Sequence, residues 1–216
     1  MKKKNISYLL VLSFLMLLCL IYSNKEVYIA KNLIINLSIV IYPISFLITG
    51  LITKEGGIKE SKKSLKLTFL IILIFYLIAS ILCTINSTTN SNDISTSLRE
   101  VFTPNYFNIY DLTIYYPNLI NLFTMLIVFY LSHNIFIILY DICKNYVSIF
   151  LTFVIAILIS GFIDQMLYVS FTTIFNGLNT KLDLVNYVKN LTANFIITIF
   201  TSIILSIIFP IITKKN

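Results

Sequence analysis

The sequence predicts an all-α, polytopic membrane protein with six transmembrane helices and both termini in the cytoplasm. Of its 216 residues, 58% are hydrophobic and 12% are charged, whereas a soluble domain is about 45–50% apolar and about 25% charged. A transmembrane helix needs about 20 mostly apolar residues, and six stretches approach or exceed that length. Because no soluble core would hide so much apolar surface, we expect residues 1–216 to form a single integral membrane domain.

The six predicted spans follow one another along the chain. The first is interpreted as a retained helix and not as a cleaved signal peptide, because its apolar run is long for one and no small-x-small cleavage motif follows cleanly. The spans are expected at about residues 6–23, 33–53, 65–85, 118–140, 146–175 and 191–212. The long outer loop at 86–117 begins as a Ser/Thr/Asn run and continues with tyrosines, which are favoured at the membrane–water interface.

The distribution of basic residues predicts the orientation. Cytoplasmic segments of membrane proteins carry an excess of Lys and Arg. With the N-terminus inside, 11 of the 16 Lys and Arg residues fall in inner segments and the other five are outside, namely Lys25, Lys31, Arg99, Lys181 and Lys189. Six spans and two cytoplasmic termini are therefore mutually consistent.

Composition and motifs also exclude several classes of function. The net charge of +7 comes from short lysine runs beside apolar segments, and no arginine-rich stripe or zinc spacing indicates a nucleic-acid partner. Cys19, Cys83 and Cys143 are isolated, so they predict neither a disulfide framework nor a metal site. The sequence contains no GxSxG, HExxH or Walker motif, and we therefore expect neither an enzyme nor a cofactor.

Two ionisable groups lie well within the predicted spans, Asp164 and His133. Ionisable groups in hydrocarbon are costly and usually face the bundle interior or a water-filled cavity, so they are functional candidates. Gly161, Asp164, Gln165 and Tyr168 follow the i, i+3, i+4, i+7 spacing of one helix face. This hydrogen-bonding face is interpreted as a ligand or proton site, and an interhelical bond that only fixes packing is the alternative.

His133 and the second span supply the other candidates. His133 lies on the same helix side as Asn134, and its neutral imidazole both donates and accepts, which suits a planar heterocycle, a proton relay or a structural hydrogen bond. In the second span a proline precedes Phe46, while Tyr42 and Thr49 share one face. Transporters often bind substrate at interrupted helices, although a simple kink is the alternative interpretation.

Three segments resemble one known family. The segment 42–57, YPISFLITGLITKEGG, has Pro43, Phe46, Thr49 and Gly57 in a pattern that is followed by a basic run. This segment resembles the queuosine-precursor transporter family, also called the vitamin uptake transporters. Two further segments resemble the same family, LSHNIFIILYDICK and LISGFIDQMLYVSFTTIF, and in the second of them Ser160 and Asp164 match the family pattern. Ser23 and Asn24 resemble the Ser-Asn that closes the first helix of that family. The resemblance covers most of the chain and implies six spans with inside termini.

The chain departs from the family pattern at several polar positions. Gly50 stands where the family has an acid in the second span, and Phe136 lies near the position of its fourth-span aspartate. His133 falls near its glutamine, and Gly161 stands where a glutamine or asparagine precedes the fifth-span aspartate. The last span has no clear match for the expected early lysine.

The resemblance implies a multi-pass uptake transporter in the plasma membrane, here the inner membrane of a bacterium. Its substrate would be a small polar heterocycle, by resemblance a deazaguanine precursor of queuosine. One alternative is the substrate-binding membrane subunit of an energy-coupling-factor vitamin importer, although the first span lacks an Ala-x-x-x-Ala pattern. A second alternative is a structural or interaction protein without a substrate. The partners expected are the lipid bilayer and a small molecule, and a homo-oligomer or a coupling subunit stays open.

Overall fold

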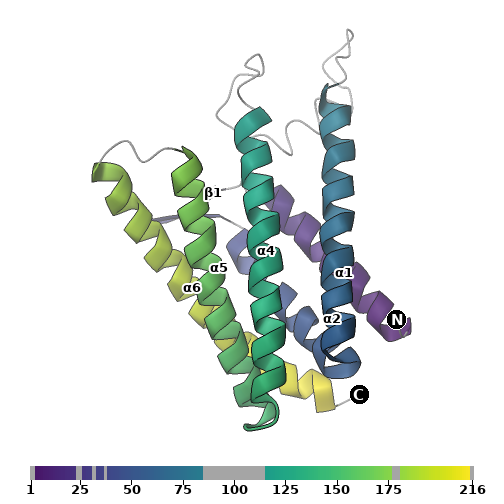
Figure 1. Cartoon of the computed structure of the whole chain (residues 1–216). Helices are drawn as coiled ribbons and strands as arrows, with labels where there is room; N and C mark the ends of the chain where they lie inside the picture. The colour runs from purple at the N-terminus through teal and green to yellow at the C-terminus, as the bar shows by residue number, and fades with distance from the viewer. Residues whose placement is uncertain are drawn as a thin grey trace.

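The chain folds into long helices and one short β-hairpin, seen in a computed structural model that describes residues 3–22, 26–30, 33–36, 38–84, 115–176 and 181–214. The helices are α1 (Lys3–Tyr22), α2 (Ser38–Thr84), α4 (Tyr115–Cys143), α5 (Ile149–Asn176) and α6 (Lys181–Lys214). Figure 1 shows them as an elongated bundle, with α4 and α5 running beside each other to a short turn.

Three helices of the described residues are long and apolar enough to cross a membrane, at Thr124–Cys143, Ile149–Phe171 and Leu191–Lys214. The whole of α4 has 29 residues, which corresponds to about 43 Å at 1.5 Å per residue. That length exceeds the roughly 30 Å of a bilayer core. The structure thus supports a helical membrane protein, while the apolar part of α1, Lys4–Leu20, is shorter than these three helices.

The side chains are distributed as expected for a protein surrounded by lipid. Large apolar side chains point outward, including Phe14 at 61% exposure and Phe200 at 66%. Hydroxyl and imidazole groups are buried instead, and Ser132 and His133 have no exposed surface. Polar groups avoid hydrocarbon and find their partners inside the bundle, so this arrangement agrees with the membrane interpretation.

Helix α2 contains two helical arms, 38–56 and 58–84, which meet at Gly57. Gly57 has φ 74° and ψ 179°, a conformation that only glycine adopts without strain. Ser61 donates across the kink to the Thr53 hydroxyl, at 3.0 Å. The sequence predicted separate spans at 33–53 and 65–85, and the connection between them is helical rather than a loop, because its lysine and glutamate residues are good helix formers.

The β-hairpin is a departure from the predicted all-α fold. Strand β1 (Glu26–Ala30) pairs antiparallel with β2 (Leu33–Asn36), and Val27 lies opposite Ile35. The predicted span at 33–53 was wrong at its start, since helical backbone begins only at Ser38. Hydropathy does not distinguish a short apolar strand from the first turn of a helix, and β-branched residues favour the strand.

Other boundaries also differ from the predictions. Helix α6 begins at Lys181, ten residues before the predicted span at 191–212, because polar residues extend the helix beyond its apolar part. Helix α5 begins at Ile149 rather than at 146. The predicted outer loop 86–117 lies outside the described residues except for its last three, which form the first turn of α4. Ser23 and Asn24 also lie outside the described residues.

The start of α1, the kink of α2 and the end of α6 meet at one end of the bundle, which we call the basic end. There Lys4 forms an ion pair with Glu55 at 2.8 Å, and the Lys54 ammonium donates to the Thr213 carbonyl at 3.2 Å. Figure 1 shows the N- and C-termini at this same end, together with the turn between α4 and α5. The start of α1 and the end of α6 therefore lie at the same end of the bundle.

The half of the bundle next to the basic end is filled by aromatic rings. Phe153 stacks on Phe209 with ring centroids 4.2 Å apart, and Phe136 meets Phe153 edge-on at 5.6 Å. Gly50 of α2 lies against them, because a Cβ atom there would be 2.8 Å from a Phe153 ring carbon. Helices α2, α4, α5 and α6 therefore meet closely here, through what we call the aromatic core: Phe136, Tyr140, Phe153 and Phe209.

Candidate functional site

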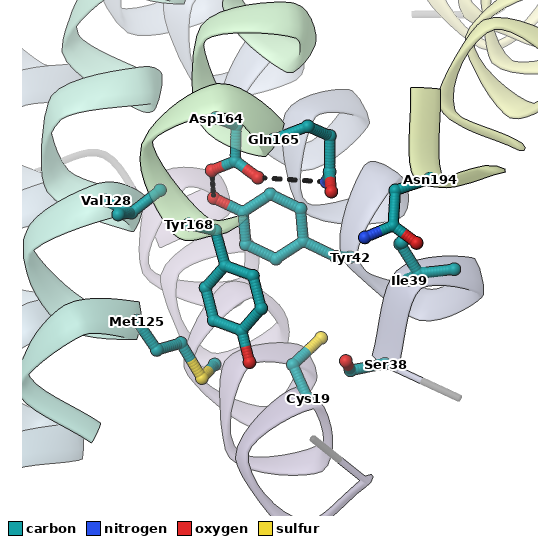
Figure 2. A pocket seen from close by; sticks show the side chains of 10 residues that line it. All are labelled: Cys19, Ser38, Ile39, Tyr42, Met125, Val128, Asp164, Gln165, Tyr168 and Asn194. Atoms are coloured by element: carbon teal, nitrogen blue, oxygen red, sulfur yellow. Dashed lines mark hydrogen bonds between the residues drawn. The ribbon is translucent and has the colours of Figure 1, made fainter. Parts of the chain in front are cut away.

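A pocket opens in the half of the bundle opposite the basic end. It has about 470 Å³ of empty space, its open mouth included, and lies among all five helices. Figure 2 shows its lining, which consists of Cys19, Ser38, Ile39, Tyr42, Met125, Val128, Asp164, Gln165, Tyr168 and Asn194. Ligand pockets are mostly apolar with a few placed polar groups, and this lining fits that description.

Asp164 and Gln165 form the most polar part of the pocket. Both are buried, with 4% and 5% of their surface exposed. Gln165 donates through Nε2 to Asp164 Oδ2 at 3.3 Å, whereas its Oε1 atom is buried without a hydrogen-bond partner. An ionised carboxylate only accepts hydrogen bonds, so the amide nitrogen must face it and the amide oxygen is left for another donor.

No cation neutralises Asp164 within the part of the chain that the structure describes. The ion pairs seen there join Lys4 to Glu55 and Lys144 to Asp141, and none of these residues lines the pocket. A buried, unpaired carboxylate is costly. Asp164 therefore favours either a proton or a ligand that brings hydrogen-bond donors or positive charge.

The hydroxyl of Tyr42 connects Asp164 to helix α4. It donates to Asp164 Oδ1 at 2.7 Å and also lies 3.1 Å from Ser132 Oγ and 3.5 Å from His133 Nδ1. Tyr42 follows the hairpin closely, in the second turn of α2, which positions its ring between the pocket and the bundle interior. A single phenol thus touches groups on α5 and on α4.

His133 lies behind Tyr42 and does not line the pocket. Its Nδ1 atom is 3.1 Å from the Phe129 carbonyl and its Nε2 atom is 2.9 Å from Ser45 Oγ. Since a carbonyl only accepts, Nδ1 carries a proton in its contact with Phe129. The single hydroxyl hydrogen of Ser45 is shared between the Tyr42 carbonyl, at 2.6 Å, and His133 Nε2. The ring of Phe46 stacks on the imidazole at 4.2 Å with an interplanar angle of 7°.

The structure brings some of the sequence candidates together and separates others. Tyr42, Asp164, Gln165 and Tyr168 line the pocket, whereas His133 and Phe46 form the layer behind it. The spacing that placed Asp164, Gln165 and Tyr168 on one face thus describes the pocket side of α5. Gly161 of the same set faces α6 instead, since a Cβ atom there would be 2.8 Å from a Thr198 methyl group.

Thr49 and Asn134 bond to their own helices and do not line the pocket. The Thr49 hydroxyl donates to the Ser45 carbonyl at 2.9 Å, and Asn134 Nδ2 donates to the Tyr130 carbonyl at 2.6 Å. Such local bonds satisfy polar side chains within a helix. Among the described residues, no three His, Cys, Asp or Glu side chains gather where they could hold a metal ion.

Sequence reasoning missed several residues of the site. Cys19, Ser38 and Met125 line the pocket, but each is small or apolar and carries no pattern that distinguishes it from core packing. Asn194 lines it too, and its polar character inside an apolar span was a usable signal. Ser132, next to the candidate His133, was the other residue that a search for buried hydroxyls would have found.

Comparisons with known proteins found no match to this chain among protein-family models, curated proteins or solved structures. The resemblance to queuosine-precursor transporters therefore rests on the sequence segments themselves.

Proposed function

We propose that this chain is a plasma-membrane uptake transporter for a small polar heterocycle, and by its resemblance for a deazaguanine precursor of queuosine. The observation that carries the proposal is the buried pair of Asp164 and Gln165 at the wall of an open pocket. The pair combines a carboxylate without a cation and a carboxamide oxygen without a donor among the described residues. Both groups are costly to bury and are explained by a ligand that supplies the missing donors.

The geometry of the pair favours a ligand with two N–H groups on one edge. Asp164 supplies a carboxylate whose two oxygens accept from Tyr42 and from Gln165 Nε2, and Gln165 adds an amide oxygen that is buried without a donor. A guanine-type ring has an N–H and an exocyclic amino group side by side, which match two adjacent acceptors. Figure 2 shows the rings of Tyr42 and Tyr168 beside these acceptors, and aromatic faces stack well on a flat heterocycle.

The test uses cells that lack their own synthesis and salvage of queuosine. They express the protein, receive nanomolar deazaguanine base, and are scored for queuosine in tRNA. We expect restoration by the wild type and at least a tenfold loss for Asp164→Asn, because the variant can no longer offer a carboxylate to the ligand. Asp141→Asn is the matched control, since that carboxylate pairs with Lys144 at the basic end, 2.5 Å away.

Two outcomes would contradict the proposal in different ways. Normal uptake by a correctly inserted Asp164→Asn protein removes Asp164 from the binding site. No restoration by wild-type protein that is shown to be in the membrane excludes this base as the substrate, and a screen of other N–H-rich heterocycles then follows.

A further inference from the structure

Asp164 is one end of a buried chain of hydrogen-bonding groups that links three helices. The chain runs from Asp164 on α5 through the Tyr42 hydroxyl on α2 to Ser132 and His133 on α4, and from His133 back to Ser45 on α2. We propose that Asp164 binds the coupling proton of transport, so that one proton enters the cell with each substrate molecule. This inference rests on the proposed function and adds the ion that drives it.

The surroundings of Asp164 favour a proton as the ion. The groups that face it are uncharged at neutral pH or only weakly acidic or basic, and the described residues place no Lys or Arg among them. They are Cys19 from α1, Tyr42 from α2, His133 from α4 behind Tyr42, Tyr168 from α5 itself and Asn194 from α6. With no fixed positive charge to oppose it, a carboxylate within a membrane bundle is stabilised by protonation.

The Tyr42 hydroxyl can follow the protonation of Asp164 without moving its ring. When Asp164 is ionised, this hydroxyl donates to Oδ1, at 2.7 Å. When a proton adds to Oδ1, the carboxyl O–H donates to the Tyr42 oxygen instead. The hydrogen of Tyr42 then turns to Ser132 Oγ, at 3.1 Å. The only covalent bond involved is the O–H bond of Asp164, which forms when the proton binds and breaks when the proton is released.

The two arrangements connect different helices. In the ionised form the donated bond of Tyr42 joins α2 to α5, and in the protonated form it joins α2 to α4. A ligand or proton shifts a conformational equilibrium only through contacts that differ between the states. The bond between Tyr42 and Asp164 persists with its direction reversed, while the bond that Tyr42 donates to Ser132 is present only in the protonated form. Loading of Asp164 therefore changes how firmly α2 is held to α4 at the pocket.

The test uses purified wild-type protein in liposomes that contain a pH-sensitive dye, with radiolabelled deazaguanine base as the probe. Counterflow of the base at equal pH measures transport without coupling. Accumulation under an outside-acid gradient of one pH unit, with and without a protonophore, measures coupling. We expect counterflow of the base at equal pH. Under the gradient we expect the base to accumulate about tenfold if one proton is coupled to each base, because one pH unit is a tenfold ratio of proton activity. We also expect the lumen to acidify only when the base is added.

The outcomes separate the two proposals. Counterflow together with accumulation that the protonophore leaves unchanged overturns proton coupling and leaves the transport proposal standing. Absence of both counterflow and binding overturns the transport proposal and this one with it. Base-driven acidification that persists at wild-type amplitude in Asp164→Asn also overturns the inference, because the proton must then bind elsewhere.

Ser132 gives a test of the partner exchange itself, as a positioning residue. Ser132→Ala removes the group to which Tyr42 donates in the protonated arrangement, so the pH midpoint of accumulation should shift from that of the wild type by about 0.5–1 unit, the equivalent of one hydrogen bond. Ser206→Ala is the control, since that buried hydroxyl donates to the Ser202 carbonyl on α6. If Ser132→Ala and Ser206→Ala show the same pH midpoint of accumulation, the proposed change of the hydrogen-bond partner of Tyr42 is overturned.

Discussion

The pocket end and the basic half of the bundle differ in what fills the space between the same helices. Near the basic end, Gly50 lets α2 approach the rings of Phe153 and Phe209, and these rings leave no room for another atom. At the pocket end the helices meet around Asp164 and Gln165, with empty space and an amide oxygen that has no partner. The basic half is filled by packed rings, whereas the pocket half leaves a cavity beside a buried carboxylate.

The departures from the pattern of the family that the chain resembles fall in both halves of the bundle. Gly50 and Phe136 stand at positions where the resemblance expects acids, and both lie in or against the aromatic core. Asp164, which matches the family pattern, lies at the pocket. His133 and Gly161, two further departures, lie instead behind Tyr42 and against α6.

The largest expected effect is the loss of packing in the aromatic core. Phe153 is fully buried, so Phe153→Ala should lower the free energy of unfolding by about 3–5 kcal/mol, the range seen when a buried ring is deleted. Thermal unfolding of the detergent-solubilised protein measures it. Phe200→Ala is the control, because that ring is 66% exposed and should change stability by less than about 0.5 kcal/mol. Equal effects would mean that the aromatic core is not the tightly packed half.

A smaller loss is expected when a methyl group is added at Gly50. Its Cβ atom would lie 2.8 Å from Phe153 and 3.0 Å from Phe209, so Gly50→Ala should destabilise the protein by about 1–3 kcal/mol through overpacking. The double variant Gly50→Ala with Phe153→Leu should be more stable than the sum of the single effects predicts, because the smaller side chain removes the clash. Strict additivity in unfolding measurements would place the strain elsewhere.

The sequence predicted the helical membrane fold because long apolar runs have few other structures open to them. It did not predict the hairpin, since Leu33–Asn36 is as apolar as the start of a span. It also did not predict that residues 54–64 stay helical apart from Gly57, because a run of lysines beside a membrane span serves as an orientation signal whatever its backbone conformation.

For the site, helix periodicity predicted the correct side of α5 but not the neighbours from other helices. Asp164, Gln165 and Tyr168 share a face by spacing, whereas the contact between Tyr42 and Asp164 joins residues 122 positions apart. Such pairing depends on how α2 packs against α5, which no local pattern contains. Thr49 was a reasonable candidate by spacing from Tyr42, but it lies two helical turns further along α2, away from the pocket, and donates to the Ser45 carbonyl.

At the pocket end, a change should affect binding more than stability. Gln165→Met removes a buried oxygen that has no hydrogen-bond partner among the described residues, which offsets the loss of the bond to Asp164. We expect the melting temperature to stay near that of the wild type and the affinity for the deazaguanine base to fall about tenfold, or about 1.4 kcal/mol. Thr201→Val, which removes a hydroxyl bonded within α6, should leave both unchanged. A large drop in stability with Gln165→Met would make Gln165 a packing residue.

The smallest effects are expected at the basic end, where Lys4, Asn5 and Tyr8 of α1 make polar contacts with α2. Asn5 is fully buried and donates to Glu60, so Asn5→Ala should cost up to about 1 kcal/mol. The hydrogen bond to Glu55 raises the pKa of the neighbouring Lys4 ammonium, yet Lys4 lies at the surface, where solvent screens an ion pair. Lys4→Gln should therefore leave the melting temperature unchanged within error. A loss as large as that of Asn5→Ala would mean that the ion pair, and not the buried amide, fastens α1 to the basic end.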